Sequence, residues 1–269
     1  LQGFNNNPLI FVMIKNSNLF SHTSSNHVVG RPFIILSRVE STNNYAMAKL
    51  HAGVVDSGTC FLAIHQTAGK GQRGKSWQAR AGENITLSIA LKLQNPQLRP
   101  FLLSAATALA CYDLFNHYAL DHVKIKWPND IYWNDRKAGG ILIESIFSGH
   151  TWLYAVIGIG ININQTRFSP NAPNAVSLKQ ITGNTFDIVT LARELAERLD
   201  SRIQWMYDTD PEKIMEAYID CLYKKGETVR LKQGNIIFET VIQRVEASGE
   251  LISRDAMERR FSFGEIEWV

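Results

Sequence analysis

Hydrophobic and polar positions recur along most of the chain in patterns that predict an α+β protein. From Asn84 to Leu93, apolar and polar residues alternate strictly, which is typical of a strand with one apolar face. Other apolar runs predict strands at residues 33–36, 59–65, 123–127, 131–133, 140–147 and 152–164. Longer segments with start and stop signals predict helices at residues 43–50, 100–118, 186–207 and 211–223. The pattern indicates a mixed β-sheet flanked by helices.

The pattern changes after Lys225 and Gly226. Short alternating apolar runs follow, separated by turn residues at 233–234, 248–249 and 263–264. Such spacing is typical of a small all-β barrel. We therefore expect three parts: a flexible N-terminal arm in residues 1–30, a large α+β domain in residues 31–222, and a small barrel in residues 223–269.

Composition and net charge limit the kinds of ligand and the cellular compartment that the chain suits. With 45% hydrophobic and 20% charged residues, the chain has the composition of a globular protein. A net charge of +3 suits an anionic small molecule, whereas duplex-DNA binding usually needs a strongly basic face. Cys60, Cys111 and Cys221 lack zinc-ligand spacing, so we expect reduced thiols and a cytoplasmic protein. No apolar run approaches the roughly 20 residues of a membrane span, so no membrane association is expected.

Residues 69–76 read Gly-Lys-Gly-Gln-Arg-Gly-Lys-Ser and match two phosphate-binding motifs, the P-loop and the dinucleotide fingerprint. Both motifs require a helix directly after the loop, and here only residues 77–83 precede the next strand. A crossover helix with its loops needs about 10–12 residues, so neither named fold fits. The alternative of a solvated hairpin tip leaves Lys70, Arg73 and Lys75 repelling one another. We therefore predict that the loop binds an anion through its cations and glycine amides.

A second polar cluster, Lys-Trp-Pro-Asn-Asp at residues 126–130, follows a predicted strand. Lys126 can reach a carboxylate or a phosphate as a point charge. Asn129 and Asp130 suit a magnesium ion, a ribose or simply the backbone of the turn. These residues alone leave the choice open.

Five segments together, in this order and spacing, resemble the biotin–protein ligases. They are Ser41-Thr42-Asn43, Gln66 with residues 69–77, residues 126–130, residues 137–144, and residues 158–162. The resemblance runs from about residue 33 to the C-terminus. It implies a catalytic domain of the class II synthetase type, an α+β mixed sheet flanked by helices, followed by a small SH3-like barrel.

The resemblance implies a two-step ligase reaction. Biotin and ATP, with Mg²⁺, give biotinyl-5′-AMP, and biotin then passes to a lysine of the biotin carboxyl carrier protein of acetyl-CoA carboxylase. The first step requires charge neutralisation and positioning rather than a protein nucleophile. Some family members also carry an N-terminal DNA-binding domain. Only about 30 residues precede the catalytic region here, so no DNA role is expected, and a homodimer is left open.

The resemblance also assigns roles to residues. Lys126 and Lys70 are the implied catalytic residues. The implied biotin contacts are Ser41, Thr42, Asn43, Gln66, Lys70, Gly71, Gln72 and Lys126. The implied nucleotide contacts are Arg73, Trp77, Asn129, Lys137 and Asn162, with Asn162 also at the metal. Structural alternatives exist for several: Ser41 or Thr42 can cap a helix, Asn162 can bond the backbone, and Trp77 can simply pack.

The loop departs from the commonest family pattern, and other functions compete with this interpretation. Lys70 and Gln72 stand where arginines are frequent, and Ser76 stands where a lysine is common. Because lysine cannot make the bidentate contact of arginine, the adenylate is expected to be held less tightly. The competing functions are a lipoate–protein ligase or octanoyltransferase, a P-loop nucleotidase, and a non-catalytic biotin-binding module. No motif indicates the base that deprotonates the acceptor lysine.

Overall fold

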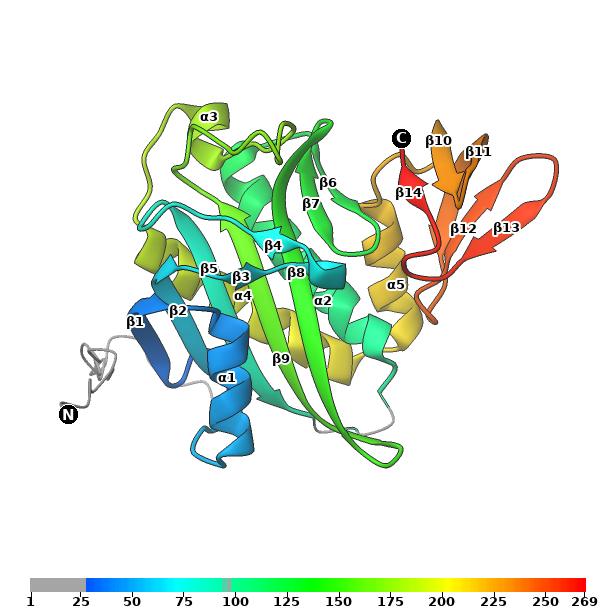
Figure 1. Cartoon of the computed structure of the whole chain (residues 1–269). Helices are drawn as coiled ribbons and strands as arrows, with labels where there is room; N and C mark the ends of the chain where they lie inside the picture. Colours follow the sequence, from blue (N-terminus) through cyan, green and yellow to red (C-terminus); the bar gives the residue numbers. More distant parts are fainter. Residues whose placement is uncertain (1–27, 94, 96–97) are drawn as a thin grey trace, which may run out of the picture.

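In the computed structural model, residues 28–93, 95 and 98–269 are described, so most of the expected N-terminal arm lies outside the described residues. The fold is built on a seven-stranded sheet (Figure 1). Its strands, in spatial order, are β1 (Phe33–Val39), β2 (Thr59–Gln66), β5 (Asn84–Lys92), β9 (Thr151–Asn162), β8 (Arg136–Ser148), β7 (Asp130–Trp133) and β6 (Val123–Lys126). Only β1 and β2 pair in parallel, and every other neighbouring pair is antiparallel.

Helices cover both faces of this sheet (Figure 1). The helices are α1 (Thr42–His51), α2 (Pro100–Ala119), α3 (Leu178–Thr182), α4 (Ile188–Asp208) and α5 (Pro211–Asp220). Helix α1 lies on one face against β5 and β9, while α2 and α4 pack together behind the other face, with α5 beside α2. The predicted mixed sheet flanked by helices is confirmed.

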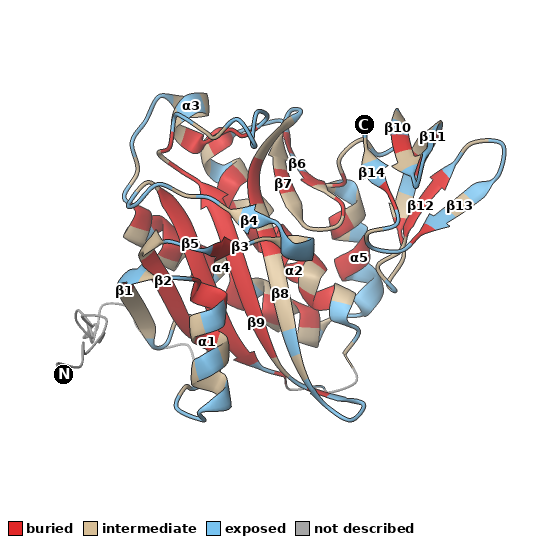
Figure 2. Cartoon of the chain, viewed as in Figure 1, coloured by how far each residue is buried: buried red, intermediate tan, exposed pale blue. Residues whose placement is uncertain are grey.

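The central strands β5 and β9 are buried along most of their length (Figure 2), and their two faces contact different apolar clusters. Ile85, Leu87 and Ile89 of β5 belong to the main core with α2 and α4. On the opposite face, Ala90 packs with Ala46 of α1 in a smaller apolar cluster. Alternation along a strand therefore leaves the rest of the α1 face to small and polar residues, which is where a ligand has room.

Two helices differ clearly from the elements predicted from the sequence. Helix α3 was not predicted, although it begins with a capping box in which Ser177 and Gln180 cap each other's backbone. Helix α5 ends earlier than expected, because residues 221–223 instead hydrogen-bond to Ile125 of the edge strand β6. The loop at 69–76 is a short hairpin of β3 (Gly69–Lys70) and β4 (Ser76–Trp77) with one 3₁₀ turn, η1 (Gln72–Gly74), so the absence of a crossover helix is confirmed.

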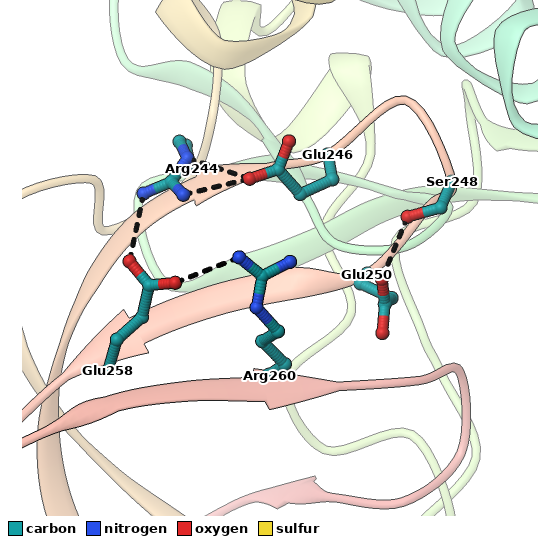
Figure 3. A network of polar contacts seen from close by, with 6 residues as sticks. All are labelled: Arg244, Glu246, Ser248, Glu250, Glu258 and Arg260. Carbon is teal, nitrogen blue, oxygen red and sulfur yellow. Dashed lines mark hydrogen bonds and ion pairs between the residues drawn. The ribbon is translucent and has the colours of Figure 1, made fainter.

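The C-terminal strands form a second, five-stranded antiparallel sheet. In spatial order they are β13 (Glu258–Phe261), β12 (Leu251–Arg254), β11 (Ile236–Val245), β10 (Thr228–Gln233) and β14 (Glu267–Trp268). The pairings leave β13 and β14 as edges, so the sheet is open in its hydrogen bonding. On the surface, an ion pair between Arg244 and Glu258 joins β11 to β13 (Figure 3). Arg244 also bonds Glu246, Arg260 bonds Glu258, and the Ser248 hydroxyl donates to Glu250 in the adjoining turn. Each exposed ion pair stabilises the fold by about 1 kcal/mol or less.

The beginning of the described chain is fixed by a buried carboxylate. Asp200 of α4 is 1% exposed, and it accepts hydrogen bonds from the backbone amides of Val28 and Val29 at 3.0 and 2.8 Å. Asp200 therefore ties the segment before β1 to the back of the sheet.

Replacing Asp200 with alanine is expected to lower the free energy of unfolding by roughly 2–4 kcal/mol, because two amide donors lose their acceptor. Urea unfolding followed by circular dichroism measures this change. Asp200→Asn keeps one acceptor oxygen and should lose less, and Glu197→Ala, at an exposed acid of the same helix, is the control. Equal stability of Asp200→Ala and Glu197→Ala would contradict an anchoring role.

None of the helices in the described part of the chain combines the length and apolar character needed to cross a membrane.

Candidate functional site

A cavity of about 1150 Å³ lies on the α1 face of the large sheet, between the 69–76 hairpin and the edge of the C-terminal sheet. Every site residue predicted from the sequence lines it: Ser41, Thr42, Asn43, Gln66, Lys70, Gly71, Gln72, Arg73, Trp77, Lys126, Asn129, Lys137 and Asn162. These residues come from five separate segments of the chain. Only the folding of the sheet brings them together.

At one end of the cavity, the start of α1 is bonded to its surroundings. Ser41 is the N-cap and accepts from the amide of Asn44, so its structural role is confirmed. Gln66 Oε1, at the end of β2, accepts from both the amide and the hydroxyl of Thr42 at 2.9 and 3.1 Å. The Ser88 hydroxyl lies 2.7 Å from Thr42 Oγ1 and 2.6 Å from Asn43 Oδ1. This end is a preordered set of donors and acceptors suited to a small polar ring.

The carboxylate of Glu144 on β8 contacts both Asn43, at the start of α1, and Lys70 of the hairpin. Its Oε2 accepts from Asn43 Nδ2 at 2.9 Å, and its Oε1 lies 3.6 Å from Lys70 Nζ. Gln72 Nε2 donates to the Ile141 carbonyl at 3.4 Å. The hairpin therefore lies across the cavity, with contacts to β8 beneath it.

The tip of the hairpin reaches the C-terminal sheet. Arg73 has a φ of +53°, a left-handed conformation within the 3₁₀ turn. Its Nη1 donates to the Gly264 carbonyl at 2.9 Å. Gly71 N donates to Lys75 O at 2.6 Å and closes the turn. The two parts of the molecule thus share the covering of the cavity.

Two glycines of β9 make room for side chains that pack directly on the strand. A Cβ atom at Gly158 would overlap the side chain of Asn43, and one at Gly160 would overlap the indole ring of Trp77. Within the described residues, Trp77 Nε1 is buried without a hydrogen-bond partner. Trp77 here is a packing residue over β9 and at the same time part of the cavity lining.

Lys126 stands at the end of β6, half-buried at the cavity wall. Its Nζ donates to the Tyr132 hydroxyl at 3.3 Å. Burial lowers the pKa of Lys126 below the ordinary lysine value; Asp130 opposes this effect and Lys137 adds to it. The ammonium form is therefore lost at a lower pH than in an exposed lysine.

The turn after Lys126 is braced by other parts of the chain. Trp127 Nε1 donates to the Gly249 carbonyl at 2.9 Å, and the Tyr218 hydroxyl donates to the Pro128 carbonyl at 3.2 Å. Asn129 Nδ2 donates to the Ile141 carbonyl. These bonds orient the turn toward the cavity rather than toward solvent.

The nucleotide candidates on β8 and β9 hold one another in place. Lys137 Nζ lies 2.7 Å from Asp130 Oδ1. Asn162 is buried, and its Nδ2 donates to the carbonyls of Val176 at 3.1 Å and Lys137 at 3.4 Å, which leaves its amide oxygen for a ligand. Over the described residues, no three His, Cys, Asp or Glu side chains gather as a metal site. This donor set fits only an ion that takes most of its ligands from phosphate and water, as Mg²⁺ commonly does.

Comparison with known proteins identifies the family of the chain. The Biotin/lipoate A/B protein ligase family matches residues 35–162. The biotin–[acetyl-CoA-carboxylase] ligase of Paracoccus denitrificans is 33% identical over 228 residues, which cover 82% of this chain and 93% of that relative. The chain belongs to the biotin–protein ligase family.

Other members of the biotin–protein ligase family differ in length. The bifunctional ligase/repressor BirA of Escherichia coli is 31% identical over 177 residues, which cover 65% of this chain and 54% of BirA. The BirA of Salmonella typhimurium is covered to 53%, so the chain spans about half the length of these two relatives.

Solved structures of the family share the fold. The biotin protein ligase from Aquifex aeolicus in complex with biotin and ATP has a TM-score of 0.73 at 23% identity, over 87% of this chain and 97% of that chain. The biotin protein ligase from Leishmania major in complex with biotinyl-5-AMP has a TM-score of 0.60 at 25% identity, over 86% of this chain and 98% of that chain. The similarity extends beyond the segment matched by the family.

Several residues at this site have no role predicted from the sequence. Ser88 is one of several polar positions, with Asn84 and Thr86, in the alternating strand β5, and the pattern alone does not single it out. Glu144 ends the 137–144 segment of the family resemblance without an assigned task. Residues 165–175 follow β9 and line much of the cavity beyond Asn162. They have no periodic pattern, so the sequence offered no comparable signal for them.

Proposed function

We propose that the chain is an ATP-dependent ligase that activates biotin as biotinyl-5′-AMP and transfers biotin to a lysine of a biotin carboxyl carrier protein. One observation carries the proposal: the five segments of the family resemblance line one cavity, with the hairpin across it. The names of the relatives support the substrates, since they include a biotin–[acetyl-CoA-carboxylase] ligase and a ligase in complex with biotin and ATP.

The chemistry needs a site that binds two anionic groups close together. In the first step a carboxylate attacks the α-phosphate of ATP, and negative charge accumulates as pyrophosphate leaves. Lys126 at the end of β6 and Lys70 in the hairpin both bring positive charge to the cavity. Thr42, Asn43 and Gln66 would orient the biotin ring at the α1 end. Arg73, Trp77, Asn129 and Lys137 would bind the nucleotide.

Magnesium, when bound with ATP, would neutralise phosphate charge and orient the leaving pyrophosphate. We assign its protein contact to the amide oxygen of Asn162, because the amide nitrogen is already engaged with backbone carbonyls.

We also propose a division at residue 222, with the catalytic domain in 31–222 and an SH3-like barrel in 223–269. The open five-stranded sheet, with its edges β13 and β14, supports the second unit. The carrier domain of acetyl-CoA carboxylase is the proposed acceptor. The three thiols, of which Cys60 and Cys111 are buried, fit a cytoplasmic enzyme.

Biotin-dependent release of pyrophosphate from ATP tests this function. We expect release with biotin, none with lipoate or octanoate, and none without an acid. Release with lipoate would instead favour a lipoate ligase, and release without any acid would favour a nucleotidase. Tight binding of biotin without release would favour a non-catalytic biotin-binding module.

Replacing Lys70 with alanine is expected to speed the release of biotinyl-adenylate by a factor of about two to five, because the exposed pair with Glu144 helps to hold the hairpin. Transfer to the carrier should slow in parallel. Dilution of the preformed complex, with mass spectrometry of free adenylate, measures the rate. Lys92→Ala, at an exposed lysine outside the cavity, is the control. An unchanged release rate would count against the role of Lys70.

A further inference from the structure

The ammonium group of Lys126 lies among three aromatic rings. Its Nζ is 4.6 Å from the ring centroid of Tyr132, 4.9 Å from that of Trp268 and 5.5 Å from that of Tyr223. All three distances fall within the roughly 6 Å range of a cation–π interaction. We call these three rings the aromatic cage.

The cage is assembled from both sheets. Tyr132 lies on β7 beside Lys126, whereas Tyr223 follows α5 and Trp268 belongs to β14. Lys126 ends β6, an edge of the seven-stranded sheet, and β14 is an edge of the C-terminal sheet. The cage therefore forms where the edges of the two sheets meet.

The rings also hold each other. The centroids of Tyr132 and Tyr223 are 5.2 Å apart, and those of Tyr223 and Trp268 are 5.8 Å apart. The Tyr223 hydroxyl donates to Asp135 Oδ1 at 2.6 Å. Trp268 pairs with Leu231 of β10. The cage is thus fixed by contacts that do not depend on Lys126 itself.

We propose that Tyr223 and Trp268 are positioning residues, which let the C-terminal sheet set the place of the Lys126 ammonium for adenylate formation. This inference rests on the proposed function. A lysine side chain has a flexible four-carbon stem, so an unheld ammonium would spend much of its time away from the reacting groups. Rings that fix it in advance preorganise the charge for the transition state.

Aromatic faces suit this task better than a carboxylate would. An acidic partner would neutralise the ammonium and compete with the substrate carboxylate and phosphate, whereas a ring attracts the cation and leaves its charge available. The nearby acids are engaged elsewhere: Asp130 pairs with Lys137, and Asp135 accepts from Tyr223.

Nuclear magnetic resonance of the apo protein labelled with ¹³C-lysine tests the cage without any activity. The ε-protons of Lys126, assigned by their loss in Lys126→Met, should be shifted upfield by the ring currents. Trp268→Ala should move them toward the position of exposed lysines, and Trp268→Phe should retain part of the shift. An ordinary position in the wild-type protein, or no change in Trp268→Ala, would overturn the proposal.

Kinetics then test whether the cage acts on the reaction through Lys126. Trp268→Ala should lower kcat for biotin-dependent pyrophosphate release by about five- to thirty-fold, with KM for biotin and ATP nearly unchanged. Trp268→Phe should recover most of kcat. In a Lys126→Met background, Trp268→Ala should have no further effect.

A matched control distinguishes the positioning effect of Trp268 from a general loss of aromatic packing. Trp205 of α4 also lies near a cation, with the Arg202 guanidinium 5.2 Å from its ring, and it lies outside the cavity. Trp205→Ala should leave kcat at the wild-type value. A rise in KM without a fall in kcat, or an equal loss in the Lys126→Met background, would overturn the positioning role. If the wild-type protein releases no pyrophosphate with biotin, the proposed function fails, and the lysine spectrum still decides the cage.

Discussion

Replacing Lys126 with methionine is expected to lower the rate of biotinyl-adenylate formation by about 10²–10³-fold, because a preorganised charge facing the transition state is lost. Methionine keeps an unbranched chain of similar length, so the packing against Tyr132 should survive. Single-turnover formation of the adenylate, followed by mass spectrometry, measures the effect on chemistry apart from product release.

Lys124 provides the matched control for this change. It lies on the same strand, β6, two residues earlier and exposed, and its Nζ donates to the Asp220 carbonyl at 3.5 Å. Lys124→Met should therefore form the adenylate at the wild-type rate. A loss of less than threefold in Lys126→Met would exclude a catalytic role for this lysine.

Replacing Gly160 with valine is expected to weaken biotin binding by roughly tenfold or more, because the added side chain displaces the Trp77 indole from β9. Trp77 belongs to the 69–77 hairpin, so the displacement also moves the implied biotin contacts Gly71 and Gln72. Valine is favoured in strands, so the sheet itself should tolerate the change. Equilibrium dialysis with labelled biotin measures the affinity, and thermal unfolding verifies the fold.

The double variant of Gly160→Val and Trp77→Ala tests whether the clash with the indole causes the loss of biotin affinity. In a Trp77→Ala background the indole is absent, so Gly160→Val should cost much less affinity than it does alone. Ser145→Val, at an exposed position of β8 outside the cavity, introduces the same side chain without an indole neighbour and should bind biotin normally. Equal losses with and without Trp77 would show that the clash is not the mechanism.

The elements predicted correctly from the sequence are those with strong local signals. The Ser41 cap and the Pro100 start predicted α1 and α2 to within about one residue, because both signals act within a single turn of helix. The strands β3 and β4 were not predicted as strands. Two residues are too few for any periodicity, and their pairing depends on the turn between them.

Local clustering along the chain predicted parts of the candidate site, the family resemblance joined its five segments, and individual contacts between segments were missed. Lys126 and Asn129 belong to one turn, so their joint location followed from the sequence. Glu144 and Lys70 are far apart in the sequence, and the fold brings their charged groups to within 3.6 Å of each other. Trp268 meets Lys126 from the far end of the sequence, and no local pattern indicates which tryptophan faces which lysine.

The hydrogen bond from Trp127 to the Gly249 carbonyl has a practical consequence for building hybrid enzymes. Exchanging residues 223–269 for the matching part of another ligase would replace the acceptor of this bond, along with Tyr223 and Trp268, while keeping the turn that they support. A working chimera would therefore have to transplant residues 126–130 together with the C-terminal sheet. The unit of exchange crosses the sequence boundary between the two parts and follows the contact surface between them.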